Sequence, residues 1–264
     1  MASPSPKLSI LIPVLNEGIN LRLMLKLLRA AVEVPCEVLV VHDTLDDDSI
    51  PVVESMQEGY PNLKLVYNKS RGIPNAIRAG VEKAEADILL LFAADEVGPV
   101  LSIEDMLDLM DQGCDFVSCT RYAHGGRRLG GSLLGGILSR TANFLFRKFS
   151  RSRFTDSTTG IKMFRRSFFN KITFESKPVG WAVTFEMSIK AQLMGIKLGE
   201  VPIISIDRLY GGKSTFRPRP WIVEYFRWFW WGFRNLGGRE LPHVHVKIPA
   251  SSPLARTESV TPHG

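Results

Sequence analysis

Short β-rich runs alternate with segments of helical periodicity through the first 120 residues. Apolar runs predict buried strands at residues 8–14, 37–42, 63–67, 87–94 and 116–119. Between them, apolar residues recur every three or four positions and predict helices at residues 20–32, 49–57, 73–84 and 103–110. Strands joined by helical crossovers lie parallel in one sheet. The pattern therefore predicts an α/β fold, with a doubly wound, mostly parallel sheet and helices on both faces.

Polar side chains follow the predicted strands at the points where the strands end. They are Asn16, Glu17, Asp43, Asp95 and Glu96. Ligands of doubly wound sheets bind at the carboxyl ends of the strands, where converging carboxylates suit a cation or a polyhydroxyl ligand. The alternative is that Asp and Asn serve there as turn and N-cap residues. We favour capping for residues 46–48 but not for Asp95, because Asp95 closes an apolar strand that requires no charge.

Signals of several other protein classes are missing from the sequence. The turn after the first strand reads PVLNEG, without the Gly-x-Gly-x-x-Gly of a dinucleotide site, and no P-loop occurs. Cys36, Cys114 and Cys119 lack metal-ligand spacing and are odd in number, which favours a reducing compartment over a disulfide framework or a zinc site. The sequence contains no signal peptide and no apolar stretch of about 18–20 residues, so we expect a soluble or peripheral protein.

Charge is divided unevenly along the chain. Of 264 residues, 45% are hydrophobic and 23% charged, a balance that excludes disorder over most of the length. Residues 1–120 carry 9 basic and 19 acidic side chains, whereas residues 121–264 carry 24 basic and 8 acidic ones. The stretch 121–171 alone holds 12 basic side chains against one acidic residue, Asp156. The positive charge of residues 121–264 predicts an anionic ligand. Nucleic acid is one candidate for that ligand, but no nucleic-acid motif accompanies the charge.

Eight blocks resemble, in order, the inverting family 2 glycosyltransferases, and most closely the dolichol-phosphate mannose synthase and polyprenyl-phosphate glycosyltransferase group. The blocks are LSILIPVLNEG, VLVVHDTLDDDS, SRGIPNAIRAG, ILLLFAADE, DFVSCTRYAHGG, LSRTAN, DSTTGIKMFRRS and IDRLYGGKST. Together they cover residues 7–217. The resemblance implies a GT-A fold over residues 1–217, with a nucleotide-sugar half at 7–120 and an acceptor half at 121–217.

The resemblance also implies an activity and its partners. One sugar would pass, with inversion, from a nucleotide-diphosphate sugar such as GDP-mannose or a UDP-sugar to a polyprenyl phosphate. The enzyme would work as a peripheral protein on the cytoplasmic face of a membrane, which leaves room for a membrane-anchoring partner subunit. No nucleic-acid partner is expected.

Donor and metal residues follow from matched positions. The donor-binding set is Pro13, Leu15, Asn16, Glu17, Asp43, Ala93 and Asp95. The family's Asp-x-Asp motif reads Ala93-Ala94-Asp95-Glu96 here, so Asp95 is the remaining metal ligand, with Glu96 or water as helper. A Mg²⁺ or Mn²⁺ ion there would take oxygen ligands and offset the charge of the leaving group. His42 stands where the family often has an aspartate.

Acceptor residues are assigned in the same way. The acceptor-binding set is Arg121, Ser139, Arg140, Asn143, Lys213 and Ser214. Arg208 would lie near the reacting phosphates, and the catalytic set is Asp95, Arg121 and Arg208. The fixed fork of arginine donors suits phosphate. The remaining basic residues between 127 and 153 are interpreted as a solvated face or a diffuse attraction to anionic lipid.

Two alternatives stand beside this interpretation. A polyprenyl phosphate oxygen is already ionised, so the protein needs only to position and neutralise phosphates. A soluble glycan or other hydroxyl acceptor would instead require a base, for which Asp156 and Glu186 are candidates. Ala93 and His42 favour the other alternative, a catalytically silent homologue that binds lipid or a partner.

The C-terminal segment is unusually aromatic. Residues 221–233, WIVEYFRWFWWGF, contain four of the five tryptophans. We predict an amphipathic aromatic helix at residues 218–236, which lies at a membrane interface, packs on the core, or does both. Residues 237–264 are predicted to form a flexible tail.

Overall fold

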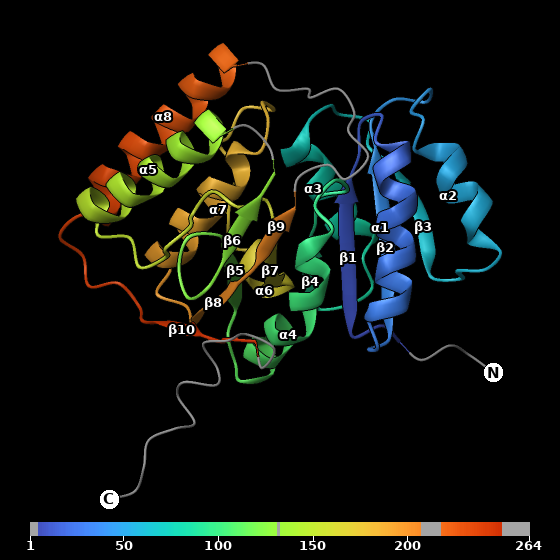
Figure 1. Ribbon diagram of the computed structural model, residues 1–264, viewed down its shortest axis with the longest axis horizontal. Helices are drawn as coiled ribbons and strands as arrows, with labels where there is room; N and C mark the ends of the chain where they lie inside the picture. Colours follow the sequence, from blue (N-terminus) through green and yellow to red (C-terminus); the bar gives the residue numbers. More distant parts are fainter. Residues whose placement is uncertain (1–4, 131–132, 207–217, 250–264) are drawn as a thin grey trace, which may run out of the picture.

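The structure is a computed structural model that describes residues 5–130, 133–206 and 218–249. Its centre is an eight-stranded sheet of order β10-β8-β5-β7-β4-β1-β2-β3 (Figure 1). The strands are β1 (Leu8–Pro13), β2 (Cys36–His42), β3 (Leu63–Tyr67), β4 (Ile88–Leu91), β5 (Phe116–Thr120), β7 (Lys162–Arg165), β8 (Leu198–Pro202) and β10 (Val244–Val246). All paired strands run parallel except β7, which is antiparallel to both β4 and β5. The α/β fold with a mostly parallel sheet is confirmed.

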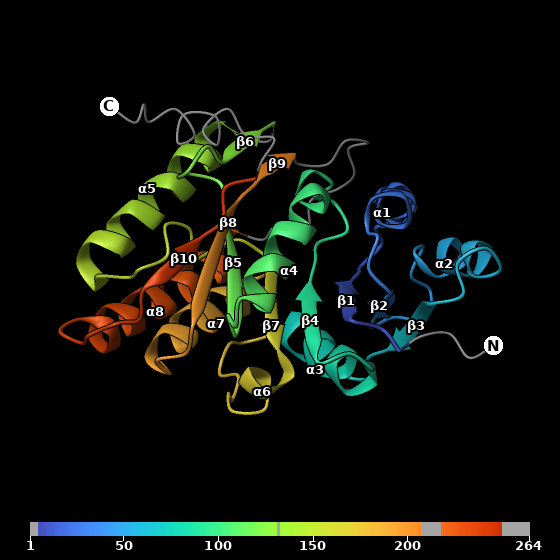
Figure 2. The same ribbon diagram turned by 90° about the horizontal axis from the view of Figure 1, so that it is seen from below.

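Helices cover both faces of this sheet. Alternate residues of β1 point to opposite sides, so that Ile10 packs in one core and Leu11 in the other. Figure 2 shows α1 and α3 on opposite sides of the strands. The helices of the first core are α1 (Gly18–Ala31), α2 (Ile50–Gln57), the 3₁₀ helix η1 (Gly98–Ser102) and α4 (Ile103–Asp111); those of the second are α3 (Ile73–Lys83), α6 (Arg166–Phe169) and α7 (Ala182–Leu193). Double-sided burial explains the continuous apolar runs of the central strands.

A third cluster joins two further helices to α7. Helix α5 (Leu133–Ser150) and helix α8 (Pro218–Leu236) lie side by side at one end of the molecule (Figures 1 and 2). Phe146 of α5 and Trp228 of α8, the latter 1% exposed, pack with Phe185 and Ile189 of α7. The core-packing interpretation of residues 221–233 is therefore confirmed for one face of α8. No helix among the described residues is long and apolar enough to cross a bilayer.

The strands of the second half were not predicted. β6 (Arg127–Leu129) and β9 (Ile204–Ile206) form a separate two-stranded parallel sheet. β10 pairs with β8 at the sheet edge, so the prediction of a flexible tail from residue 237 is wrong for residues 244–246. These strands hold three residues each, which is too short for a period-two pattern to stand out. The sheet also spans both predicted halves, because β7 lies between β4 and β5.

Candidate active site

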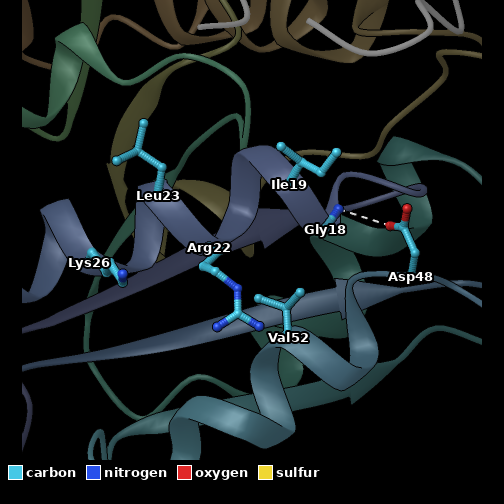
Figure 3. Close-up of a pocket in the computed structure, with 7 residues that line it drawn as sticks. All are labelled: Gly18, Ile19, Arg22, Leu23, Lys26, Asp48 and Val52. Carbon is cyan, nitrogen blue, oxygen red and sulfur yellow. Dashed lines mark hydrogen bonds between the residues drawn. The ribbon is translucent and has the colours of Figure 1, made fainter. Parts of the chain in front are cut away.

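The loops after β1 and β2 hold each other in place. The backbone N–H of Asn16, whose φ is 55°, donates to Asp47 Oδ2 at 3.1 Å. The N–H of Gly18, at the start of α1, donates to Asp48 Oδ1 at 2.8 Å (Figure 3). Asp47 Oδ1 also accepts the N–H of Ser49 at 2.8 Å, just before α2. Asp47 thus serves as a turn residue before α2, and Asp48 bonds the first N–H of α1, the helix that follows the neighbouring loop, rather than capping α2.

A surface pocket of about 500 Å³ lies beside these loops, between α1 and α2 (Figure 3). Its lining consists of Gly18, Ile19, Arg22, Leu23, Lys26, Asp48 and Val52. None of the residues predicted to bind the donor lines it. The pocket is therefore separate from the strand ends at which the donor is expected.

The ends of β2 and β3 form a second part of the predicted donor site. Asp43 Oδ2 accepts the N–H of Gly72 at 3.1 Å, which orders the turn before α3. Gly72 has φ 94°, and a Cβ there would lie 2.4 Å from Pro178 Cβ. His42 is buried next to Asp43, and its ring lies 5.5 Å from that of the half-exposed Tyr67. Asp43 thus supports the backbone around the strand ends where a nucleotide is expected.

Asp95 lies in the turn after β4 and is partly buried, whereas Ala93 is buried. Glu96 accepts a hydrogen bond from Ser205 Oγ at 3.3 Å, which ties its carboxylate to β9. Within the described part of the chain, no group of three or more His, Cys, Asp or Glu side chains could hold a metal ion. Mg²⁺ is commonly bound by one or two carboxylates together with substrate phosphates. An ion held by one or two carboxylates of the turn after β4 would need further oxygen ligands from a bound diphosphate.

Arg121, directly after β5, makes a bidentate ion pair with Asp156. Its Nε donates to Oδ2 at 2.7 Å and its Nη2 to Oδ1 at 3.1 Å. The Asp156 side chain is 0% exposed and that of Arg121 11%. Burial would raise the pKa of Asp156, but the charge and hydrogen bonds of Arg121 hold that pKa below its ordinary value. The pair is a preformed, nearly dry arginine site at the carboxyl end of β5.

Both carboxylates considered as bases have structural partners. Asp156 is committed to Arg121, with a lowered pKa. Glu186 is fully buried in α7, accepts the N–H groups of Glu175 and Ser176 at 2.7 and 2.9 Å, and pairs with Lys190 at 2.7 Å. Each carboxylate therefore fixes a loop through its hydrogen bonds and its ion pair.

The residues predicted to bind the acceptor or the reacting phosphates, beyond Arg121, divide into three groups. Tyr122 donates from its hydroxyl to Ser139 Oγ at 2.8 Å, and Asn143 Nδ2 donates to Thr158 Oγ1 at 2.8 Å. The structure therefore brings Ser139 and Asn143 together with Arg121, whereas Arg140 is exposed on α5. Arg208, Lys213 and Ser214 lie outside the described residues.

Two buried ionisable residues of this region were missed by sequence reasoning. Lys162 of β7 is 0% exposed and donates from Nζ to Ser118 Oγ at 2.7 Å; burial lowers its pKa to about 8. Glu200 of β8 accepts the N–H and hydroxyl of Thr155 at 2.8 and 2.7 Å, and burial raises its pKa to about 7. A charged residue inside the apolar run IKMF was the available signal for Lys162.

Solved structures share the overall fold. One of them is glucosyl-3-phosphoglycerate synthase from Mycobacterium tuberculosis, in complex with Mn²⁺, UDP and glucosyl-3-phosphoglycerate. The match has a TM-score of 0.64 and 15% identity, and it covers 89% of this chain and 81% of the synthase. It also resembles a mannosyltransferase from Pyrobaculum calidifontis in complex with GDP-Man and Mn²⁺, with a TM-score of 0.61, 17% identity and coverage of 97% of this chain and 70% of that one. These neighbours are GT-A glycosyltransferases.

Fold and sequence together define a nucleotide-sugar glycosyltransferase of the GT-A type. The sequence model described as Glycosyl transferase family 2 matches residues 9–173, more than half of the chain, and the protein belongs to that family. Two relatives named dolichol-phosphate mannosyltransferase are each 24% identical to it. The match covers 84% of this chain and 64% of the relative from Pyrococcus furiosus, and 85% and 81% for that from Mycosarcoma maydis.

Proposed function

We propose that this glycosyltransferase moves a single sugar from a nucleotide-diphosphate sugar to a polyprenyl phosphate at the cytoplasmic surface of a membrane. The observation that carries the proposal is the attachment of the Arg121 site to α5. Tyr122 and Thr158, which both contact Arg121, are hydrogen-bonded to Ser139 and Asn143 of that helix. A phosphate-binding arginine is thus fixed to a helix with an apolar outer surface.

Helices α5 and α8 together expose a set of large apolar side chains, here named the α5–α8 face. Its members are Leu133, Ile137, Leu138, Phe144, Phe149, Ile222, Val223, Phe226, Trp230 and Phe233, each at least 38% exposed. Exposed Arg147, Lys148 and Arg227 accompany them on the same helices. Large exposed apolar patches mark sites of interaction, and a basic border suits anionic headgroups. This face supports docking on a bilayer, from which a lipid phosphate reaches Arg121.

The chemistry needs no protein base. An oxygen of the ionised acceptor phosphate attacks the anomeric carbon, the bond from that carbon to the donor diphosphate breaks, and the nucleoside diphosphate leaves with the bonding electrons. In-line attack inverts the anomeric configuration. A divalent ion, when bound, offsets charge on the leaving diphosphate, and Asp95 would hold it. Arg121 positions and neutralises the acceptor phosphate, while Pro13, Leu15, Asn16, Glu17, Asp43 and Ala93 are the residues proposed to surround the donor.

The donors to test first follow from the relatives and neighbours. Two relatives are named dolichol-phosphate mannosyltransferase, and one neighbour binds GDP-Man. Another neighbour binds UDP. GDP-mannose and UDP-glucose are therefore the first donors to test with this chain.

The test is a transfer assay with labelled donor. Purified protein is incubated with labelled GDP-mannose or UDP-glucose, Mn²⁺ or Mg²⁺, and undecaprenyl or dolichyl phosphate in detergent, and the lipid is then extracted. We expect label in the lipid phase with at least one donor. The matched control replaces the lipid phosphate with the free polyprenol. Label transferred to the polyprenol would indicate a hydroxyl acceptor, and absence of labelled lipid with every donor would refute the proposal and favour a silent homologue.

A further inference from the structure

Lys162 lies behind the Arg121–Asp156 pair and is buried to 0% exposure. Its register partner across the β5–β7 pair is Ser118, and its Nζ donates to Ser118 Oγ at 2.7 Å. Ser118 Oγ lies 3.4 Å from the backbone carbonyl oxygen of Asp156. The ammonium is therefore linked through one hydroxyl to the residue that holds Arg121.

The buried ammonium of Lys162 changes the net charge of the Arg121 site. Arg121 and Asp156 form a pair whose charges cancel, so the pair alone offers little net attraction to an anion. Lys162 adds one positive charge, and its interaction with Asp156 favours the ionised carboxylate. With Lys162 included, the three side chains carry one net positive charge.

The other groups that face Lys162 offset only part of its charge at neutral pH. Burial raises the pKa of the Cys119 thiol, which keeps it neutral, and raises that of Glu200 to about 7, which leaves it partly protonated. On the opposite side, its partner on β4 is Leu91, which has no charge. Glu200 therefore offsets part of the positive charge of Lys162, and the remainder acts on Asp156 and Arg121.

Within the described part of the chain, the hydrogen bonds of Arg121 use only part of its guanidinium. Its Nε and Nη2 are used by Asp156 and Thr158. Among the described residues, no acceptor bonds its Nη1 group. The geometry thus fixes the guanidinium on one edge and leaves another edge available.

We propose that Lys162 is a positioning residue for the acceptor phosphate, whose ammonium balances the charge of Asp156 so that Arg121 presents a net positive charge to the phosphate. This inference rests on the proposed function. Lys162 itself does not touch the substrate, because Ser118 and Asp156 lie between. The ligand class is a phosphate monoester, such as the head of a polyprenyl phosphate.

The first test compares Lys162→Met, Lys162→Arg and a matched control, Lys64→Met. Lys64, on β3, also pairs with a buried carboxylate, that of Glu37, at 2.9 Å. This pair is not part of the Arg121 site. We expect Lys162→Met to raise the KM for undecaprenyl phosphate about tenfold, as loss of a nearby charge implies, with the donor KM and the thermal midpoint little changed. In Lys162→Arg the KM for undecaprenyl phosphate should stay close to that of the wild type, and in Lys64→Met it should equal that of the wild type. An unchanged acceptor KM in Lys162→Met, or an effect on the donor KM alone, would overturn the inference.

A pH profile separates this role from simple structural support. The pKa of Lys162 is about 8, so the wild-type acceptor KM should rise as the pH increases through 8 and the ammonium loses its proton. In Lys162→Arg this rise should move to higher pH, because a guanidinium stays charged. Glu200 remains in both proteins and cannot cause the difference. If the rise stays at the same pH in Lys162→Arg, Lys162 is not its source and the inference fails, even where Lys162→Met does not fold.

Calorimetric titration with farnesyl phosphate separates this inference from the proposed function. If the wild type binds farnesyl phosphate, Lys162→Met binds it more weakly and no lipid is glycosylated, the proposed function fails while the role of Lys162 stands. If the wild type and Lys162→Met both glycosylate lipid with the same KM for the lipid phosphate, only the role of Lys162 fails. If the wild type neither binds farnesyl phosphate nor transfers sugar, both fail.

Discussion

Single residues of the site differ in how far the sequence reveals them. Asp95 was predicted because a carboxylate closes an apolar strand, and Arg121 because it follows a strand in a recognised block. The ion pair of Arg121 with Asp156, and the place of Lys162 beside that pair, were not predictable, because both depend on the pairing of β5 with β7. Burial and ion pairing are tertiary properties, and no local pattern records them.

Asp95 gives the first prediction at this scale. If Asp95 holds a divalent ion on the donor diphosphate, Asp95→Asn should lower turnover about 10²- to 10³-fold, in line with loss of a main electrostatic group. Transfer rates measured across a Mn²⁺ titration would also show a higher metal requirement. The control is Glu96→Gln, whose carboxylate already accepts from Ser205 and should matter less. Equal turnover and metal dependence in Asp95→Asn would remove Asp95 from the metal site.

Asp156 gives a prediction on stability and pH. Its folded pKa lies below the ordinary 3.8, so its contribution to stability is fully present above pH 3.8 and is lost as the pH falls through the folded value. Asp156→Asn leaves Arg121 without its ionised partner and should cost about 3–5 kcal/mol at pH 7. Urea denaturation between pH 3 and 7 should then show a flatter profile than the wild type.

The control for Asp156 is Asp115→Asn. Asp115 is 34% exposed and lies 3.8 Å from Arg165, so its loss should change stability by less than about 1 kcal/mol. Equal losses in the two variants would mean that the Arg121 pair is no more important to folding than a surface contact.

At the scale of elements, the sequence prediction held best where a strand is a continuous apolar run. The strands predicted at 8–14 and 37–42 correspond to β1 and β2, which are buried on both faces, and the weaker run at 63–67 corresponds to β3 at the sheet edge. β7 and β8 were missed because charged residues and a glycine interrupt KMFR and LGEVP, and β6, β9 and β10 were missed because they have three residues each. For helix α8 the packing role is confirmed on the side that contacts α7, whereas the membrane role of its exposed side stays a prediction.

The two sides of α8 lead to opposite expectations. Trp228 is 1% exposed, so Trp228→Ala should lower the free energy of unfolding by about 3–5 kcal/mol. Trp230 is 50% exposed, so Trp230→Ala should change the free energy of unfolding little. Trp230→Ala should instead weaken binding to vesicles that contain anionic phospholipid, because aromatic side chains favour the membrane interface. Denaturation and vesicle sedimentation measure the two effects. Equal vesicle binding by Trp230→Ala and the wild type would argue against docking through α8.

At the scale of the whole molecule, one sheet spans the predicted donor and acceptor halves. β7, from residues 162–165, lies between β4 and β5, which both precede it in the chain. The sequence could not show this, because the blocks follow one another along the chain and carry no record of strand order. The fold class was predictable from periodicity, but the connection of the halves was not.

Truncation tests this connection. A fragment of residues 1–126 retains β1 to β5 but lacks β7, so β4 and β5 have no strand between them. We expect it to lack a cooperative thermal transition and to aggregate, because unpaired strand edges promote association. Near-ultraviolet circular dichroism and light scattering would be compared with the full chain. A monomeric, cooperatively folded fragment would contradict this expectation.

The position of β7 has a consequence for synthesis on the ribosome. The middle of the sheet stays incomplete until residues 162–165 leave the exit tunnel, well after β4 and β5. The predicted donor half therefore cannot finish folding as an early domain, and exposed strand edges must persist during elongation. For this chain, the period of greatest risk from aggregation is set by the order of synthesis, because the edge of β4 stays unpaired until β7 inserts and the other edge of β5 until β8 pairs with it.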